Sequence, residues 1–443
     1  MGPLRCGQPD PDFAPLVKNP KIGVALALVF AASLWFYVYA VLVPYQRADA
    51  AAHERPRGNL SDLYPRWLGS RELLLHRRNP YSAEITREIQ VGYYGRELDP
   101  SHPNDPKDQQ GFVYPVYVAF LLAPTVQLPF EPVMIAFKCA LVIFTVASVW
   151  LWLLALDWRP QRSTVATILL LTLGCFPFAQ GFKLQQLSLV AATLLALAVA
   201  LLVKGQSFSS GVVLAVATIK PQLVLPLLGC LLLWSLSEWR SRQRFVWGFG
   251  ATMAVLGGAG QWLLPGWIGE FRAAASDYRR YTGGQSLLDS LLSPGVGHVV
   301  SLIVLLCLTI LAWRLRQADV GSTKFSLLVA TALATTLVVI PMFAPYNQLL
   351  LLPAIFLIAR KWGELWSKGL WSCVGCCLTV AIVGWPWLAS IGLVIASLAL
   401  PATTIQKGWA IPLFTSLAIP IVLLIQLASL LAEALGVRAD ETA

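Results

Sequence analysis

Charged residues are scarce in this sequence. Only 13% of its 443 residues are Asp, Glu, Lys or Arg, whereas soluble domains carry roughly a quarter. Hydrophobic residues make up 57% of the chain. This balance excludes a soluble globular domain and predicts a polytopic membrane protein. Its fold class is all-α, because backbone groups in lipid must be hydrogen-bonded within the segment that carries them.

Histidine is rare as well, with four residues, and no helical His pair or His/Asp cluster is present. Cys373, Cys376 and Cys377 stand together, but they lie in an apolar run with no His or carboxylate beside them. Such small residues typically allow close helix packing. We therefore predict no metal and no cofactor.

The formal net charge of +10 does not indicate a nucleic-acid partner. Such binding needs a basic face with interleaved aromatic residues in a soluble domain, which the sequence lacks. Positive residues in the cytoplasmic loops of a membrane protein account for the excess instead. The predicted environment is a lipid bilayer.

The first apolar run, Ile22–Val43, has no charge and is long enough to cross a hydrocarbon layer of about 30 Å. Apolar runs later in the chain predict roughly ten to fourteen crossings in all. Residues 370–400 are long enough for two short passes around Pro386. We predict a single transmembrane domain over residues 22–434, between a cytoplasmic tail (1–21) and a C-terminal tail (435–443).

Orientation follows from the short basic loops "EWRSRQR", "WRLRQADVGSTK" and "ARKWGELWSK", which favour the cytoplasm. Residues 45–111 and 265–294 then become external loops. This count is consistent only if at least one short, Pro-bounded run between 113 and 219 is re-entrant or half-length. Such a segment occurs where it is buried in protein or lines a cavity.

The external loop 45–111 holds ten basic and ten acidic residues. "DLYPRWLGSRELLLH" predicts a short surface helix that starts near Asp62, and "NPYSAEITREIQ" predicts a second one with Ser82 as N-cap. On spacing alone, Asp62 is an N-cap whose carboxylate accepts from free backbone N–H groups.

The order of residues in this loop points to another role for Asp62. Asp62, Tyr64, Gly69 and then "NPY" (79–81) resemble the signature of glycosyltransferase family 87. The stretches "FVYPVYVAF", "LQQLSL", "IKPQ", "GGQSLL" and "PYNQLL" are similar to later family motifs in the same order. Here Gln185 stands for the family's Gly and Ser188 for its Asn, and "PYNQLL" has no His.

The resemblance implies a GT-C-like bundle and an integral membrane glycosyltransferase. Such enzymes move a hexose, here mannose, from a polyprenyl-phosphate sugar donor to a glycan or glycolipid acceptor, with inversion. Asp62 then serves as the general base, on the extracytoplasmic face of a bacterial plasma membrane. The reaction needs a carboxylate for the acceptor proton and positive charge for the departing phosphate.

Lys220, in "IKPQ" beside a predicted helix start, is the first candidate for the phosphate. The alternative is a lysine that only reaches toward the membrane surface. Lys183 and Arg66 are further candidates, although Arg66 and Arg71 could instead pair with neighbouring acids. Lys138 is an intramembrane charge and therefore a functional or paired residue. The neutral candidates for sugar hydroxyls are Tyr81, Tyr114, Gln186, Gln222, Gln285, Tyr346 and Asn347.

Other acids compete with Asp62. Asp277 and Asp289 flank Gln285 and could supply a second carboxylate, whereas Asp99, Asp105 and Asp108 fall in a stretch typical of a solvated turn. Two other functions remain open: a transporter or flippase, and a polysaccharide ligase or polymerase with a diphosphate-linked donor. Arg272, Arg279 and Arg280 in loop 265–294 would suit the latter.

Overall fold

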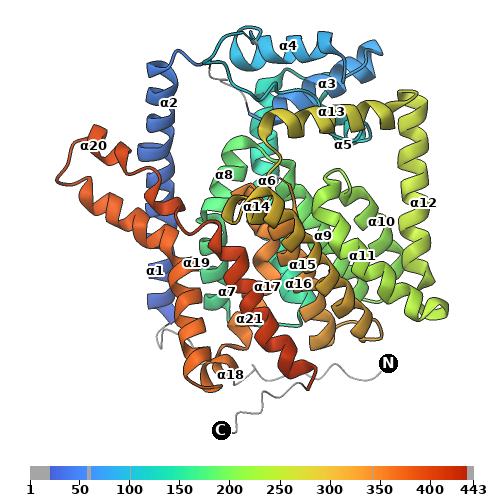
Figure 1. Ribbon diagram of the computed structural model, residues 1–443, viewed down its shortest axis with the longest axis vertical. Helices are drawn as coiled ribbons and strands as arrows, with labels where there is room; N and C mark the ends of the chain where they lie inside the picture. Colours follow the sequence, from blue (N-terminus) through green and yellow to red (C-terminus); the bar gives the residue numbers. More distant parts are fainter. Residues whose placement is uncertain (1–19, 57–60, 100, 342, 437–443) are drawn as a thin grey trace.

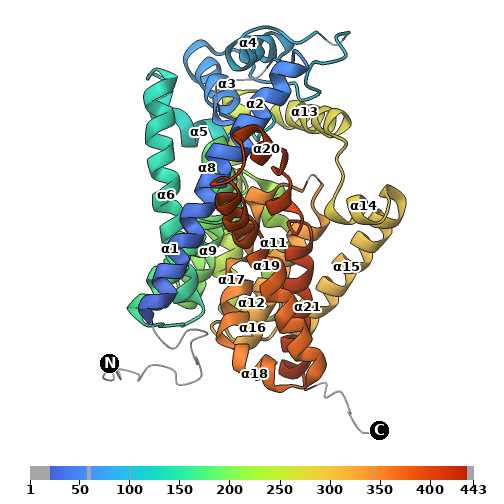
Figure 2. The same ribbon diagram turned by 90° about the vertical axis from the view of Figure 1, so that its left-hand side faces the viewer.

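The computed structural model describes residues 20–56, 61–99, 101–341 and 343–436, and the regular elements in these residues are all helices. Most of them stand side by side in one bundle, and shorter helices cover one end (Figures 1 and 2). The predicted all-α polytopic class is confirmed. Nearly all of both predicted tails lies outside the described residues.

Five helical segments are long and apolar enough to cross a membrane. They are Pro20–Ala52, which joins α1 (Pro20–Phe36), the π-helical η1 (Tyr37–Leu42) and α2 (Val43–Ala52), then α6 (Phe130–Ala155), α15 (Pro294–Arg314), α19 (Leu370–Ala396), and Ala402–Ala434, which joins α20 (Ala402–Lys407), η4 (Ile411–Leu413) and α21 (Ala418–Ala434). The pair α7 (Arg162–Leu173) and α8 (Phe176–Leu184), which meet at 52°, makes a sixth if it is counted as one span.

The remaining apolar helices are shorter than a full span. They are α9 (Leu187–Val203), α10 (Ser207–Ala217), α11 (Pro221–Ser237) and α16 (Thr323–Val339). The 17 residues of α9 extend over about 25 Å, less than a hydrocarbon layer of about 30 Å. Thirteen of the 17 residues in each of α9 and α16 are buried, so these helices contact mainly protein rather than lipid. By length, the described residues therefore hold five or six full spans, fewer than the crossings expected from apolar runs.

Three segments differ in detail from the sequence-based expectations. The run 113–128 forms only α5 (Val118–Leu122) and the 3-10 turn η2 (Ala123–Thr125), which are too short to cross. This agrees with the expectation that at least one run between 113 and 219 is not a full crossing. The first helix extends to Ala52, beyond the predicted loop start at residue 45. Pro386 lies inside the continuous helix α19, so two passes around it are wrong.

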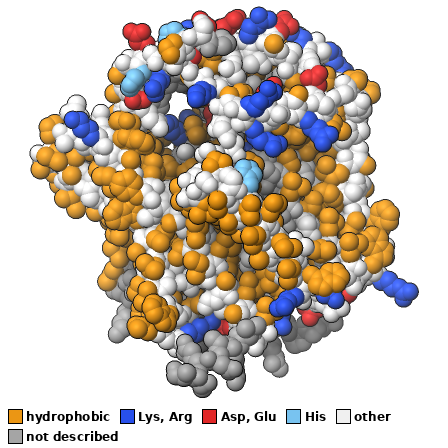
Figure 3. Space-filling view, viewed as in Figure 1, with side chains coloured by type: hydrophobic (Ala, Val, Ile, Leu, Met, Phe, Trp, Pro, Cys, Tyr) orange, Lys and Arg blue, Asp and Glu red, His pale blue; other side chains and the backbone are white. Residues whose placement is uncertain are grey.

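The two predicted surface helices are present as α3 (Leu63–His76) and α4 (Ala83–Tyr94). They lie with α13 (Trp267–Thr282) over one end of the bundle, and the long helix α12 (Trp239–Leu263) leads up to α13 (Figure 1). Charged side chains gather at this end, whereas hydrophobic side chains cover most of the body below it (Figure 3). The remaining short elements are α14 (Leu287–Leu291), η3 (Pro345–Leu351), α17 (Leu352–Arg360) and α18 (Trp362–Ser367).

Candidate active site

The start of α3 places Asp62 beneath the covering helices. Asp62 precedes α3 with helical backbone angles, and its side chain makes no capping hydrogen bond. Its backbone N–H donates to the carbonyl of Leu184 at 3.1 Å, which ties the start of α3 to the end of α8. The N-cap interpretation of Asp62 is therefore wrong, whereas Ser82 does cap α4, accepting from the N–H of Ile85.

The Asp62 carboxylate is held by two side chains from distant parts of the chain. The Tyr93 hydroxyl, on α4, donates to Oδ1 at 3.2 Å. The Gln186 amide Nε2, at the start of α9, donates to Oδ2. Both oxygens are thus oriented by neutral donors, and no described cation forms an ion pair with this carboxylate. A carboxylate held in this way keeps lone pairs for a substrate hydroxyl.

Gln186 also contacts Lys220, the lysine that precedes α11. Its Oε1 accepts from Lys220 Nζ at 3.1 Å, while its Nε2 donates to Asp62. One amide therefore bridges the candidate base and the candidate phosphate-binding cation. The lysine is buried, with 6% of its surface exposed, which does not fit the alternative of a side chain reaching for the membrane surface.

Ser188 completes this network. Lys220 Nζ donates to Ser188 Oγ at 2.6 Å, and Ser188 Oγ donates to Asn347 Oδ1 at 2.7 Å. Ser188 thus retains a polar contact although the family pattern has Asn at this position. Buried polar groups linked in this way fix one another's orientation.

Asp62, Gln186 and Lys220 line one cavity of about 500 Å³, called the Asp62 cavity below. It brings together most of the predicted site residues: Asp62, Arg66, Tyr114, Gln186, Lys220, Gln222, Tyr346 and Asn347. They come from segments more than 280 positions apart in the chain. Asp62 and Lys220 thus share a cavity, as the enzymatic interpretation requires.

Aromatic faces support the two cations of this cavity. The Arg66 guanidinium lies over the Tyr114 ring at 4.8 Å, and Lys220 Nζ lies 5.2 Å from the centroid of Tyr346. Arg66 donates to the backbone carbonyl of Asp62 and not to its carboxylate. Cation–π contacts hold these charges without neutralising them, so both can still bind an anion.

The motif "NPY" positions Tyr114. The Asn79 side chain accepts from the N–H of Tyr81 at 2.9 Å, and the Tyr81 hydroxyl donates to the carbonyl of Tyr114 at 2.5 Å. Tyr81 packs edge-on against Phe112 and does not line the cavity. In place of the predicted contact with the sugar, the Tyr81 hydroxyl positions the backbone of Tyr114.

Gly69 is required for the same packing. A Cβ atom at Gly69 would lie 2.4 Å from Cδ2 of Phe112. We expect Gly69→Ala to lower the melting temperature of the purified protein, because overpacking of this kind costs about 1–3 kcal/mol. Gly257→Ala on α12, where no atom lies within 4 Å of the new Cβ, is the control and should leave the melting temperature equal or higher. An unchanged melting temperature for Gly69→Ala would contradict this packing.

Two predicted residues lie elsewhere. Lys183 lines a different cavity, where it donates to Gln46 Oε1 at 3.0 Å. Gln285 is exposed and does not line the Asp62 cavity. The acids near Gln285 are also absent from the cavity: Asp277 is exposed and pairs with Arg280, and Asp289 forms a capping box with Ser286.

The sequence-based reasoning missed a second carboxylate. Asp108 was assigned to a solvated turn, but it lines the Asp62 cavity. Burial, and to a lesser degree the nearby Asp62 carboxylate, raise the pKa of Asp108 above its usual value. Tyr93 and Tyr278 were missed as well, whereas Arg272 and Arg279 were expected only for the diphosphate-dependent alternative. The two arginines and Tyr278 come from α13 and line the cavity, and no sequence signal singled out Tyr278.

The raised pKa of Asp108 predicts a stability effect. The folded protein binds a proton at Asp108 more tightly than the unfolded chain, so the ionised carboxylate opposes folding at neutral pH. Asp108→Asn should therefore melt at the same or a higher temperature than the parent at pH 7. This difference should shrink as the pH falls through the folded-state pKa toward the usual aspartate value.

Asp99→Asn serves as the control for this experiment. Its hydrogen bonds from Ser101 lower the pKa of Asp99, which is the opposite direction, so the variant should gain no stability at pH 7. A melting temperature that falls in Asp108→Asn but not in Asp99→Asn would contradict the assigned burial.

Within the described residues, no group of three or more His, Cys, Asp or Glu side chains is close enough to hold a metal ion. The described cysteines are all free thiols. The Asp62 cavity itself is lined by carboxylates, cations and neutral hydrogen-bonding groups.

A sequence model of glycosyltransferase family 87 matches residues 112–341, more than half of the chain. The chain belongs to glycosyltransferase family 87. The match includes Tyr114, Gln186 and Lys220, and Asp62 lies before it. Family membership makes this protein a membrane-embedded glycosyltransferase and sets aside the transporter interpretation. No curated protein and no solved structure matches the chain.

Proposed function

We propose that this family 87 glycosyltransferase moves a hexose, and specifically mannose, from a polyprenyl-phosphate donor to an extracytoplasmic glycan or glycolipid acceptor. The observation that carries the proposal is the Gln186 amide, which joins the Asp62 carboxylate to the Lys220 ammonium at one cavity. Direct displacement at a sugar carbon needs these two groups near each other. One takes the acceptor proton and the other stabilises the negative charge on the leaving phosphate.

The bond changes are those of a single inverting step. The acceptor oxygen bonds to the anomeric carbon as the bond from that carbon to the phosphate oxygen breaks. Asp62 receives the hydroxyl proton, and the electron pair of the broken bond stays on the phosphate. Lys220 and Arg66, held over tyrosine rings, are the cations assigned to this phosphate.

The test is transfer of labelled mannose from polyprenyl-phosphate mannose in membranes that contain the protein. We expect label in a new glycan or glycolipid product, with the anomeric configuration opposite to that of the donor. Transfer from a nucleotide sugar but not from the lipid-linked donor would contradict the proposed donor class. Retention of configuration would contradict the single displacement.

A second candidate has a specific observation in its favour. Arg272 and Arg279 of α13 line the Asp62 cavity, and these additional cations would suit a diphosphate leaving group, as in a polysaccharide ligase or polymerase. A polyprenyl-diphosphate sugar offered in the same assay separates the two. Faster transfer from the diphosphate donor would favour this candidate over the monophosphate-dependent enzyme.

A further inference from the structure

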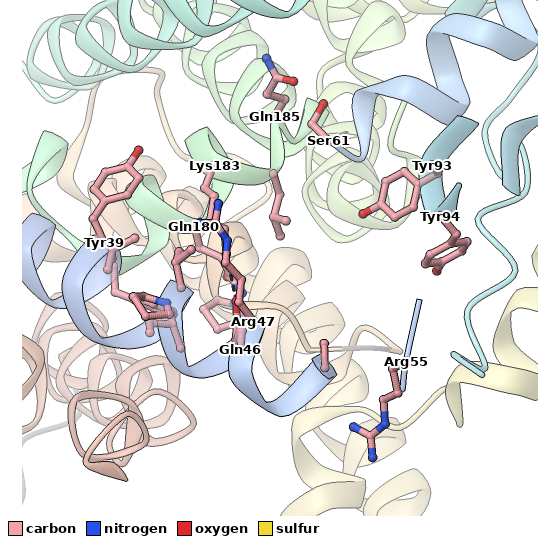
Figure 4. A pocket seen from close by; sticks show the side chains of 18 of the residues that line it. Tyr39, Gln46, Arg47, Arg55, Ser61, Tyr93, Tyr94, Gln180, Lys183 and Gln185 are labelled. Atoms are coloured by element: carbon pink, nitrogen blue, oxygen red, sulfur yellow. Dashed lines mark hydrogen bonds between the residues drawn. The ribbon is translucent and has the colours of Figure 1, made fainter. Parts of the chain in front are cut away.

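A second cavity, larger than the Asp62 cavity, has a lining of one charge sign. It measures about 990 Å³, and the charged residues that line it are Arg47, Arg55, Lys138 and Lys183, with no Asp or Glu among the described lining residues. We call it the basic cavity. It is lined by residues of the first span, α4, α6 and α8, and Figure 4 shows side chains from the first span, α4 and α8 around it. The Asp62 cavity, in contrast, contains both Asp62 and Asp108.

Two of these four cations, Arg47 and Lys138, have no carboxylate partner among the described residues. Arg55 pairs with Asp49 at 3.2 Å, and Lys183 donates to the neutral Gln46. Among the described residues, no carboxylate forms an ion pair with Arg47 or Lys138. Several cations gathered around a cavity without acids favour an anion within it.

Lys138 gives the strongest indication because of its depth. It lies eight residues into the membrane-spanning helix α6, which corresponds to about 12 Å along the helix axis. The first turns of α6 pack against α3 in a cluster that includes Trp67 and Val133. A lysine that far into a span is costly unless it serves a binding site or has a partner.

The basic cavity also has an apolar part. Val38 and Leu42 of the first span, Met134 of α6 and Phe176 of α8 line it together with the cations. A cavity that is cationic in one part and apolar in another matches a molecule with a charged headgroup and a hydrocarbon chain. A soluble anion would use only the cationic part.

The basic cavity reaches the candidate base from a separate side. Ser61, Tyr93 and Gln185 line it, whereas their neighbours Asp62 and Gln186 line the Asp62 cavity. Tyr93 donates directly to the Asp62 carboxylate, so this carboxylate lies at the boundary between the cavities. Gln185 has left-handed backbone angles, and this break between α8 and α9 lets consecutive side chains line different cavities.

We propose that the basic cavity binds the phosphate-bearing headgroup of the acceptor, so that the acceptor is an anionic lipid-linked glycan. This inference rests on the proposed function, because it assigns the acceptor of that reaction. The acceptor hydroxyl then approaches Asp62 from the basic cavity, while the donor phosphate lies toward Lys220. Nucleophile and leaving group approach from different sides, as an inverting displacement requires.

The first test measures lipid binding by the full chain in neutral detergent. Phosphatidylglycerol, phosphatidylcholine with the same acyl chains, and inorganic phosphate are compared through the shift in melting temperature. We expect a shift with phosphatidylglycerol only. An equal shift with phosphatidylcholine would overturn the anionic preference, and a full shift with inorganic phosphate would overturn the lipid class.

Matched variants locate that binding. The double variant Arg47→Gln, Lys138→Gln removes two positive charges from the cavity. It should bind phosphatidylglycerol about tenfold or more weakly, the equivalent of one charge-assisted hydrogen bond. Arg47→Lys, at an exposed position that tolerates the change, should retain binding. Arg159→Gln is the control, since Arg159 is 83% exposed and remote from the cavity lining. Equal affinity in the double variant and in Arg159→Gln would overturn the assignment.

The second test examines the reaction product. After transfer of labelled mannose and mild acid cleavage of the remaining donor, the labelled product is applied to an anion-exchange column. We expect it to bind and to elute with salt. A labelled product that passes through uncharged would overturn this inference and leave the proposed function intact, whereas the absence of any labelled product would contradict the proposed function itself.

Discussion

Replacement of Asp62 by Asn is expected to lower sugar transfer by about 10²–10⁴-fold, the usual contribution of a general base. The amide is nearly isosteric with the carboxylate, so the packing of α3 against α8 through the Asp62 N–H and the Leu184 carbonyl should persist. The lost group is the only part of the side chain able to take the acceptor proton. Initial rates of labelled transfer in membranes, normalised to protein amount, measure the effect.

Asp277→Asn is the matched control for this variant. Asp277 is exposed, pairs with Arg280 and lies outside the Asp62 cavity, so neutralising it should change transfer by less than about threefold, within the range of surface substitutions. Loss of activity in both variants would indicate that removal of any negative charge at this end of the molecule lowers transfer, and not the removal of a general base. Full activity in Asp62→Asn would remove Asp62 from the mechanism.

Replacement of Lys220 by Gln is expected to reduce kcat/KM for the lipid-linked donor by about 10²–10³-fold, comparable to the removal of one preorganised group that stabilises developing charge. The glutamine can still donate to Ser188 or Gln186, but it brings no positive charge to the leaving phosphate. The reduction should appear in both kcat and the KM for the donor, because the cation acts on the bound phosphate and on the transition state.

Lys204→Gln provides the comparison. Lys204 follows α9 on the exposed surface and lies outside both cavities, so its neutralisation should leave donor kinetics unchanged. If Lys220→Gln retained kcat/KM within about threefold of the parent, phosphate stabilisation would have to be assigned to Arg66 and the α13 arginines alone.

The sequence predicted α3 and α4, two of the covering helices, because the starts of these helices depend on local signals. Ser82 and the run after Asp62 carry helix-start chemistry, and the motif order marks Asp62, Gln186 and Lys220 as groups for one reaction. The structure brings these three residues to one cavity. The role of Ser188, where the chain departs from the family pattern, follows only from its position between Lys220 and Asn347.

Other features could not be predicted because they depend on tertiary burial. Asp108 lies in a stretch whose composition is typical of exposed turns, yet Tyr94 donates to its backbone carbonyl and the covering helices place its carboxylate inside the cavity. The arginines of α13 reach the site only because α12 carries that helix over the bundle (Figure 1). Apolar runs predicted more crossings than the five or six described segments that are long and apolar enough to cross, since hydropathy does not distinguish a helix surrounded by lipid from one surrounded by protein.

The bend between α7 and α8 has a mechanical consequence. The Asp62 N–H is hydrogen-bonded to the carbonyl of Leu184, the last residue of α8, and Gln186 follows two positions later. The end of α8, whose direction is set by the bend, therefore positions the base and its amide partner together. Lys220, between α10 and α11, is hydrogen-bonded to the same amide, so the end of α8 also sets the spacing between the proton acceptor and the leaving-group cation.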